Sequence, residues 1–167
     1  MKTRLLTRAG LLIALGIVLP YLAHLTGIGG NMFLPMHLSP LLAGFLVGPL
    51  YGLIIGAVLP PLNFAISGMP PMPTMAFMIF ELAAFGLITG LMYKKFRVII
   101  SLITAMLAGR VLYALAFALL IEFQNPLLII GGGIVTGLPG IVIQLALIPL
   151  IVKVLERREM TAGPERY

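Results

Sequence analysis

The stretch LPMHLSPLLAGFLVGPLYGLIIGAVLPPLN, residues 34–63, is apolar almost throughout and contains a Gly-Pro step at Gly48 and Pro49. Proline lacks an amide donor and disfavours helix in the residue before it, so a turn is expected there. The stretch then divides into a short helix over 35–47 and a longer one over 50–66. If residues 35–66 formed one long helix instead, everything after them would lie on the opposite side of a membrane.

The rest of the chain is just as apolar. Of its 167 residues, 60% are hydrophobic and 10% are charged, and the mean hydropathy is +1.14. A soluble domain of this size could not bury so much apolar surface, so the solvent must be a lipid bilayer. A spanning helix needs about 20 apolar residues. We therefore predict an all-α integral membrane protein, one domain over residues 1–167, built as a bundle of six transmembrane helices at approximately 5–25, 35–47, 50–66, 74–93, 98–121 and 127–155.

The basic residues test this count. All but Arg110 fall in three groups, which are Lys2, Arg4 and Arg8, then Lys94, Lys95 and Arg97, and finally Lys153, Arg157, Arg158 and Arg166. Lys and Arg favour the cytoplasmic side of a membrane. Four crossings followed by two place all three groups there, with both termini cytoplasmic. The charge is thus a topology signal and not a nucleic-acid footprint, which would need a solvated basic face.

A few ionisable residues lie in or beside the apolar segments, namely His37, Glu81, Arg110 and Glu122. Such groups are costly in a membrane and usually mark a functional site. Glu81 and Arg110 lie on consecutive antiparallel helices, with Glu81 somewhat farther along its helix from the connecting turn. They can form a structural ion pair or part of a polar pocket, and we favour a pocket open to the outside that binds a small solute.

Other polar and aromatic residues can converge on the same pocket. Tyr113 lies one helical turn from Arg110 and shares its face. The remaining candidates are His37, Asn31, Asn63, Phe77 and Gln144, and His37 serves equally well as an interfacial residue without a role. Asn63 and Gln144 serve equally well as hydrogen-bonding links between helices, and Phe77 suits a core contact as well as a flat ligand. No cysteine, nucleotide-binding loop, metal-ligand spacing or Ser-His-Asp set is present in the sequence. No cofactor or catalytic residue is therefore expected.

Small residues recur every four positions, at Gly44, Gly48, Gly52 and Gly56 and again at Gly86 and Gly90. This spacing lines one face of a helix with small side chains and lets two backbones approach closely. Internal packing accounts for most of these pairs. Gly10 and Ala14 in the first helix have the same spacing and can instead dock a partner protein.

The segment L-L-A-G-F-L-V-G-P followed by G-L-I-I-G, within residues 41–56, resembles the second and third helices of S-components of energy-coupling factor (ECF) transporters. The small-residue pair in the first helix, the acidic residue in the fourth and the basic C-terminus are also similar. The resemblance implies a six-helix substrate-binding subunit of an ABC-type importer in a prokaryotic plasma membrane. Its solute would be a vitamin or vitamin precursor, bound near the outer face by the first outer loop and the last three helices.

The resemblance also implies partners. The first helix would dock a membrane scaffold subunit through Gly10 and Ala14, and two cytoplasmic ATPases would drive import by toppling the binding subunit. The solute stays open at this point, because Arg110 suits a carboxylate or phosphate whereas Glu81 suits an amine or a protonated ring nitrogen. Two other classes compete, which are a small membrane enzyme using Glu81 or His37, and a ligand-free assembly protein in which Glu81 and Arg110 merely pair.

Overall fold

The computed structural model describes residues 2–25, 35–120 and 126–161. This part of the chain contains helices and short connections but no strand, which confirms the all-α prediction. The helices are α1 (Lys2–Leu25), α3 (Pro35–Leu46), α4 (Pro49–Ser67), α5 (Thr74–Tyr93), α6 (Val98–Leu120) and α7 (Pro126–Thr161). The last helix continues to Thr161, beyond the end at Leu155 that the sequence suggested.

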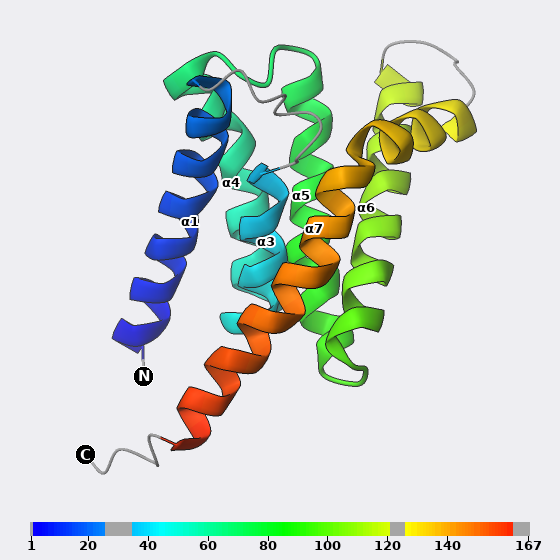
Figure 1. Cartoon of the computed structure of the whole chain (residues 1–167). Coiled ribbons are helices and arrows are strands. Elements are labelled where there is room, and N and C mark those ends of the chain that lie inside the picture. Colours follow the sequence, from blue (N-terminus) through cyan, green and yellow to red (C-terminus); the bar gives the residue numbers. More distant parts are fainter. Residues whose placement is uncertain (1, 26–34, 121–125, 162–167) are drawn as a thin grey trace.

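The helices run alternately towards the two ends of a bundle (Figure 1). The start of α1, the turn between α3 and α4, the turn between α5 and α6, and the end of α7 all lie at one end. The described basic residues Arg4, Arg8, Lys94, Lys95, Arg97, Lys153 and Arg157 belong to the elements that meet at this end. A hydrogen bond from the Tyr93 hydroxyl to Glu156 Oε1 joins α5 to α7 there. The described helices thus alternate in direction along the chain.

Among the described residues, five helices are long and apolar enough to cross a membrane, namely α1, α4, α5, α6 and α7. The chain is therefore a multi-pass membrane protein. Helix α3 has only 12 residues, and at ~1.5 Å per residue it is about 18 Å long, less than a bilayer core of about 30 Å. Most of its side chains are buried by neighbouring helices. A six-crossing count and cytoplasmic termini stay predictions.

The turn after α3 forms at the Gly-Pro step. Gly48 has φ of 100°, a conformation that only glycine adopts without strain. The amides of Val47 and Gly48 both donate to the carbonyl of Ala43, at 2.9 and 3.1 Å, and close the end of α3. Pro49 then begins α4, where its missing N–H is not needed. The sequence signal for a turn here was therefore local and sufficient.

Glycines bring α4 into backbone contact with α5. A Cβ built on Gly52 would lie 2.6 Å from the carbonyl oxygen of Gly86, and one built on Gly56 would lie 2.0 Å from that of Leu82. Neither distance leaves room for any side chain, so these glycines serve internal packing. Large apolar side chains on the outside of the bundle, such as Leu11 and Leu119, are exposed as lipid-facing residues must be.

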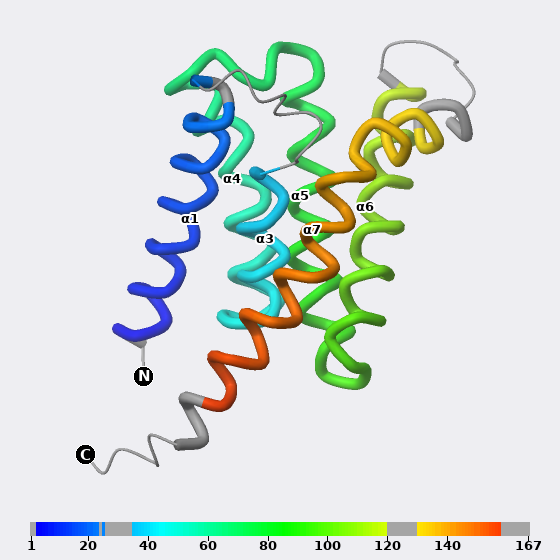
Figure 2. Tube along the Cα trace, in the orientation of Figure 1, coloured from blue at the N-terminus to red at the C-terminus, as the bar shows by residue number. Residues whose placement is uncertain are grey.

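Helix α7 changes direction along its length. In Figures 1 and 2 its yellow part runs obliquely beside the end of α6, and its orange and red parts then cross the front of the bundle. Pro139 lies within this helix, and an internal proline removes one backbone hydrogen bond and bends the helix. The bend lets α7 contact both α6 and α3.

Candidate functional site

Glu81 lies at the centre of a group of three ionisable side chains from three helices. Its Oε1 is 2.9 Å from Arg110 Nη1 on α6, and its Oε2 is 3.7 Å from His37 Nε2 on α3. The Glu81 side chain is 1% exposed and that of Arg110 is 14% exposed. The direct Glu81–Arg110 contact answers a question that the sequence had left open. It joins α5 to α6 inside the membrane-spanning part of the bundle.

The ionisable side chains of this group lie close together, but several of their polar atoms make no hydrogen bond to the described residues. Arg110 Nη1 lies 2.9 Å from Glu81 Oε1, but its N–H groups are not directed at that oxygen. The contact is therefore an ion pair without a hydrogen bond. The 3.7 Å separation between His37 and Glu81 is too long for a hydrogen bond. Both ring nitrogens of His37 lack a hydrogen-bond partner among the described residues. Buried polar groups in proteins are nearly always hydrogen-bonded, so the His37 ring is a candidate to bind a solute.

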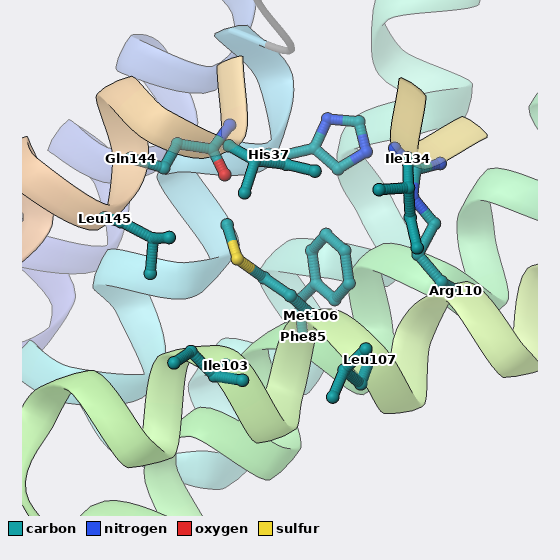
Figure 3. Close-up of a pocket in the computed structure, with 10 residues that line it drawn as sticks. His37, Phe85, Ile103, Met106, Leu107, Arg110, Ile134, Gln144 and Leu145 are labelled. Atoms are coloured by element: carbon teal, nitrogen blue, oxygen red, sulfur yellow. The ribbon is translucent and has the colours of Figure 1, made fainter. Parts of the chain in front are cut away.

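A cavity of about 310 Å³ lies beside this group, between α3, α5, α6 and α7. Its polar lining comes from His37, Arg110 and Gln144. The rest of the wall is apolar and consists of Phe85, Ile103, Met106, Leu107, Ile134, Ile141 and Leu145. Figure 3 shows the polar ends of Gln144, His37 and Arg110 along one side of the view, with the Phe85 ring and the Met106 sulfur towards the middle. An apolar cavity of this size with a few polar groups is typical of small-molecule sites.

The aromatic candidates lie next to the cavity wall. The ring of Phe77 is buried and makes edge-on contacts with Tyr113 and Phe117, at centroid distances of 5.8 and 5.4 Å. This cluster joins α5 to α6 beyond the Glu81–Arg110 pair, farther from the basic end. Neither Phe77 nor Tyr113 is among the residues that line the cavity. A direct role of either in solute binding stays a prediction.

Asn63 is placed elsewhere. Its side-chain amide donates to the carbonyls of Gly16 and Leu59, each at 3.0 Å. It therefore ties α4 to α1, the linking role that the sequence allowed as an alternative, and the structure does not bring it to the cavity. Ser39 makes a similar link from α3 to the carbonyl of Leu12. Asn31 and Glu122 lie outside the described residues.

Gly10 and Ala14 are exposed on α1, which lies at the edge of the bundle (Figure 1). A Cβ built on Gly10 would meet nothing within 4 Å. Gly16 on the same helix faces the opposite way, since its Cβ would lie 2.6 Å from Leu59 Cδ1. The two glycines show that one face of α1 packs inwards while the face bearing Gly10 and Ala14 is open.

Sequence reasoning named the polar residues of the wall but missed the apolar ones. Helical spacing would have found several of them. Phe85 lies four residues after Glu81, and Met106 and Ile103 lie four and seven residues before Arg110, so each shares a face with its charged neighbour. Among the described residues, no group of three or more His, Asp or Glu side chains could hold a metal ion.

Comparison with protein families gives one match. The family described as "ECF transporter, substrate-specific component" matches residues 4–152. No curated protein and no solved structure gives a significant match. This family consists of transport subunits, not enzymes, and membership implies association with an energy-coupling module and a small-molecule substrate. Because the match extends over most of the chain, the protein belongs to the family of substrate-specific components of ECF transporters.

Proposed function

We propose that this protein captures a vitamin or vitamin precursor for an ABC-type importer and binds it in the cavity between α3, α5, α6 and α7. The observation that carries the proposal is the buried His37, whose ring nitrogens have no hydrogen-bond partner among the described residues and which lines a cavity shared with Arg110. A ligand-free assembly protein has no need for a cavity of about 310 Å³ beside its ion pair.

The orientation follows from charge. Arg4, Arg8, Lys94, Lys95, Arg97, Lys153 and Arg157 belong to groups that lie at one end of the bundle (Figure 1). The positive-inside tendency makes this end cytoplasmic, with both termini inside the cell and six crossings in all. The connection between α4 and α5 then faces outwards, and solute enters the cavity from that side of a prokaryotic plasma membrane.

The first test is mass spectrometry of small molecules released from gently purified protein. We expect a vitamin-like compound in about equal amount to the protein, and its loss from Arg110→Met protein of unchanged elution volume. Arg97→Met is the matched control, since Arg97 is exposed in the turn before α6. A solute that is retained equally by both variants contradicts the assignment of the cavity.

The partner-docking face is the open face of α1. We expect Gly10 and Ala14 to admit the close approach of a helix of a membrane scaffold subunit. Two cytoplasmic ATPases bound to that scaffold then drive import, during which the binding subunit topples and releases its solute inside the cell. Gly10→Leu or Ala14→Leu should prevent co-purification with the scaffold while solute binding is unchanged. Gly131→Leu is the control, because Gly131 is also exposed with nothing within 4 Å of its Cβ. Survival of the complex in both α1 variants would place docking elsewhere.

A further inference from the structure

The wall of the cavity has the chemistry of an anion site. Arg110 brings a guanidinium to the wall, with Gln144 and His37 as the other polar side chains. Within residues 2–25, 35–120 and 126–161, no acidic side chain lines the cavity. A solute in this space therefore meets a positive charge and hydrogen-bond donors, and no carboxylate from the part of the chain that the structure describes.

Glu81 lies behind this wall. It is 1% exposed and contacts Arg110 through Oε1, yet it is not among the lining residues. A guanidinium has five N–H donors, and the contact with Glu81 involves Nη1 alone. The carboxylate thus holds Arg110 in the membrane and orients it, while further N–H groups remain for an acceptor on the cavity side.

His37 completes the set of donors. Its ring lines the cavity 5.3 Å from the Phe85 ring, measured between centroids. Every imidazole carries at least one N–H donor, and the N–H of His37 makes no hydrogen bond to the described residues. A carboxylate offers about four lone-pair sites, enough to accept from Arg110 and His37 together.

The remaining wall limits the rest of the solute. It is formed by aliphatic side chains with Phe85 and Met106, which favour a flat or branched apolar body. Hydroxyl groups buried there without hydrogen-bond partners would weaken binding. A cationic amine would face the guanidinium with no carboxylate within the lining to receive it.

We propose that the cavity selects an amphipathic organic anion, a small apolar or aromatic body with one carboxylate, which is held by the Arg110 guanidinium and the His37 ring with Glu81 behind them. This inference rests on the proposed function and narrows it. Between Arg110 and Glu81 it favours Arg110 as the group that contacts the solute, because Arg110 lines the cavity and Glu81 does not.

The test uses three probes of similar size with the same phenylpropyl skeleton, 3-phenylpropanoate, 3-phenylpropylamine and 3-phenylpropanol, titrated calorimetrically into the purified full chain in detergent. We expect saturable binding of the carboxylate above that of the amine and the alcohol. Arg110→Met should weaken it roughly tenfold to a hundredfold, as expected for a lost hydrogen-bonded charge contact. Arg97→Met should leave it unchanged. If Arg110→Met does not fold, Arg110→Lys should keep the preference for the anion at lower affinity, since lysine keeps the charge but lacks the planar fork.

The direction in which Glu81→Gln changes the affinity for the carboxylate probe distinguishes an anion site from an amine site. Removal of the competing negative charge behind Arg110 should leave carboxylate affinity equal or higher, whereas a site for amines would lose its binding. Tighter binding of the amine than of the carboxylate, or no binding of the carboxylate, overturns the inference. A cationic or neutral solute recovered by mass spectrometry would overturn it too, but would leave the proposed transport role standing. That role fails separately if no solute is recovered and no energy-coupling module co-purifies.

Discussion

The segment of α5 from Glu81 to Phe85 packs against a glycine of α4 on one side and a glycine of α6 on the other. A methyl group added at either glycine should therefore have a different effect. Gly56 of α4 faces the carbonyl of Leu82, and Gly109 of α6 faces the Phe85 ring. Gly10 of α1 faces open space. Alanine at these three positions is one chemical change in three surroundings, and the structure predicts three different results.

At Gly56 the added Cβ meets backbone. It would lie 2.0 Å from the oxygen and 2.4 Å from the carbon of the Leu82 carbonyl, whereas ordinary contact begins at 3.4 Å. Helices α4 and α5 must therefore move apart by about 1 Å or more. Overpacking of this kind costs up to about 3 kcal/mol, and the helix preference of alanine offsets about 1 kcal/mol. We expect a net loss of about 2 kcal/mol, or a melting temperature lowered by roughly 4–8 °C.

At Gly109 the added Cβ meets a side chain. It would lie 2.2 Å from Phe85 Cε1 and 2.3 Å from Cδ1, with the Glu81 carbonyl oxygen next at 2.9 Å, so the closest contacts are with the ring and the backbone contact is milder than at Gly56. The ring can turn away, but Phe85 lines the cavity, so a displaced ring alters the space available to solute. We expect Gly109→Ala to weaken solute binding more than it lowers stability. Gly10→Ala should change neither by much, with at most about 1 kcal/mol gained from helix preference.

Stability can be followed by heating each variant in detergent and measuring the folded fraction by size-exclusion chromatography, since the chain has no tryptophan for fluorescence. Affinity is measured in parallel with the solute recovered from the protein. Equal melting of Gly56→Ala and Gly10→Ala would refute the close contact between α4 and α5. Unchanged solute affinity in Gly109→Ala would refute the place of Phe85 in the site.

Four further variants test three separate contacts. Arg110→Met leaves the Glu81 carboxylate, which is 1% exposed, without its cation and should lower the free energy of unfolding by about 3–5 kcal/mol. Glu81→Gln leaves a guanidinium that is 14% exposed and faces the cavity, so the melting temperature of this variant should fall less. Equal falls in the two variants would contradict this asymmetry. Asn63→Leu removes the hydrogen bond from α4 to the Gly16 carbonyl of α1 and a second one to the Leu59 carbonyl within α4, and should lower stability by about 1 kcal/mol in the same heating assay without changing solute affinity. Tyr93→Phe removes the bond to Glu156 at the basic end and should cost less than about 1 kcal/mol, because that contact is exposed; a larger fall in melting temperature would show that it fixes α7.

Much of the fold could be predicted because its signals are local. Apolar runs mark the helices, the Gly48–Pro49 step marks a turn, and the basic groups mark one end of the bundle. The family was also visible in the sequence, and the match over residues 4–152 confirms it. The short helix over residues 35–46 was the weak point, since length alone could not say whether it spans the membrane.

The site was only partly predictable because it depends on rotation about the helix axes. A polar residue in an apolar helix can face a cavity or another backbone, and the sequence gives the same signal for both. Gln144 faces the cavity, whereas Asn63 faces the carbonyls of α1 and α4. Which of the two occurs is decided by how the helices pack, and that depends on glycine contacts between residues of different helices, which no local sequence signal gives.

Depth within the bundle explains why His37, Glu81 and Arg110 meet. Glu81 precedes Tyr93, the last residue of α5, by 12 positions, and Arg110 follows Val98, the first residue of α6, by 12 positions. At ~1.5 Å per residue both lie about 18 Å from the basic end, so their contact needs no reach along the axis, contrary to the offset expected from sequence.

Helix α3 turns back from the same end and begins only two residues before His37. His37 precedes Leu46 by nine positions, which places the imidazole about 14 Å from the turn and close to the depth of the ion pair. A longer second helix could place a histidine at the same depth, but its backbone would continue past that level. Because α3 is short, its first turn lies close to the depth of the ion pair, and His37 is in that turn. The short second helix, which was the least certain element in the sequence, therefore brings a third helix to the site.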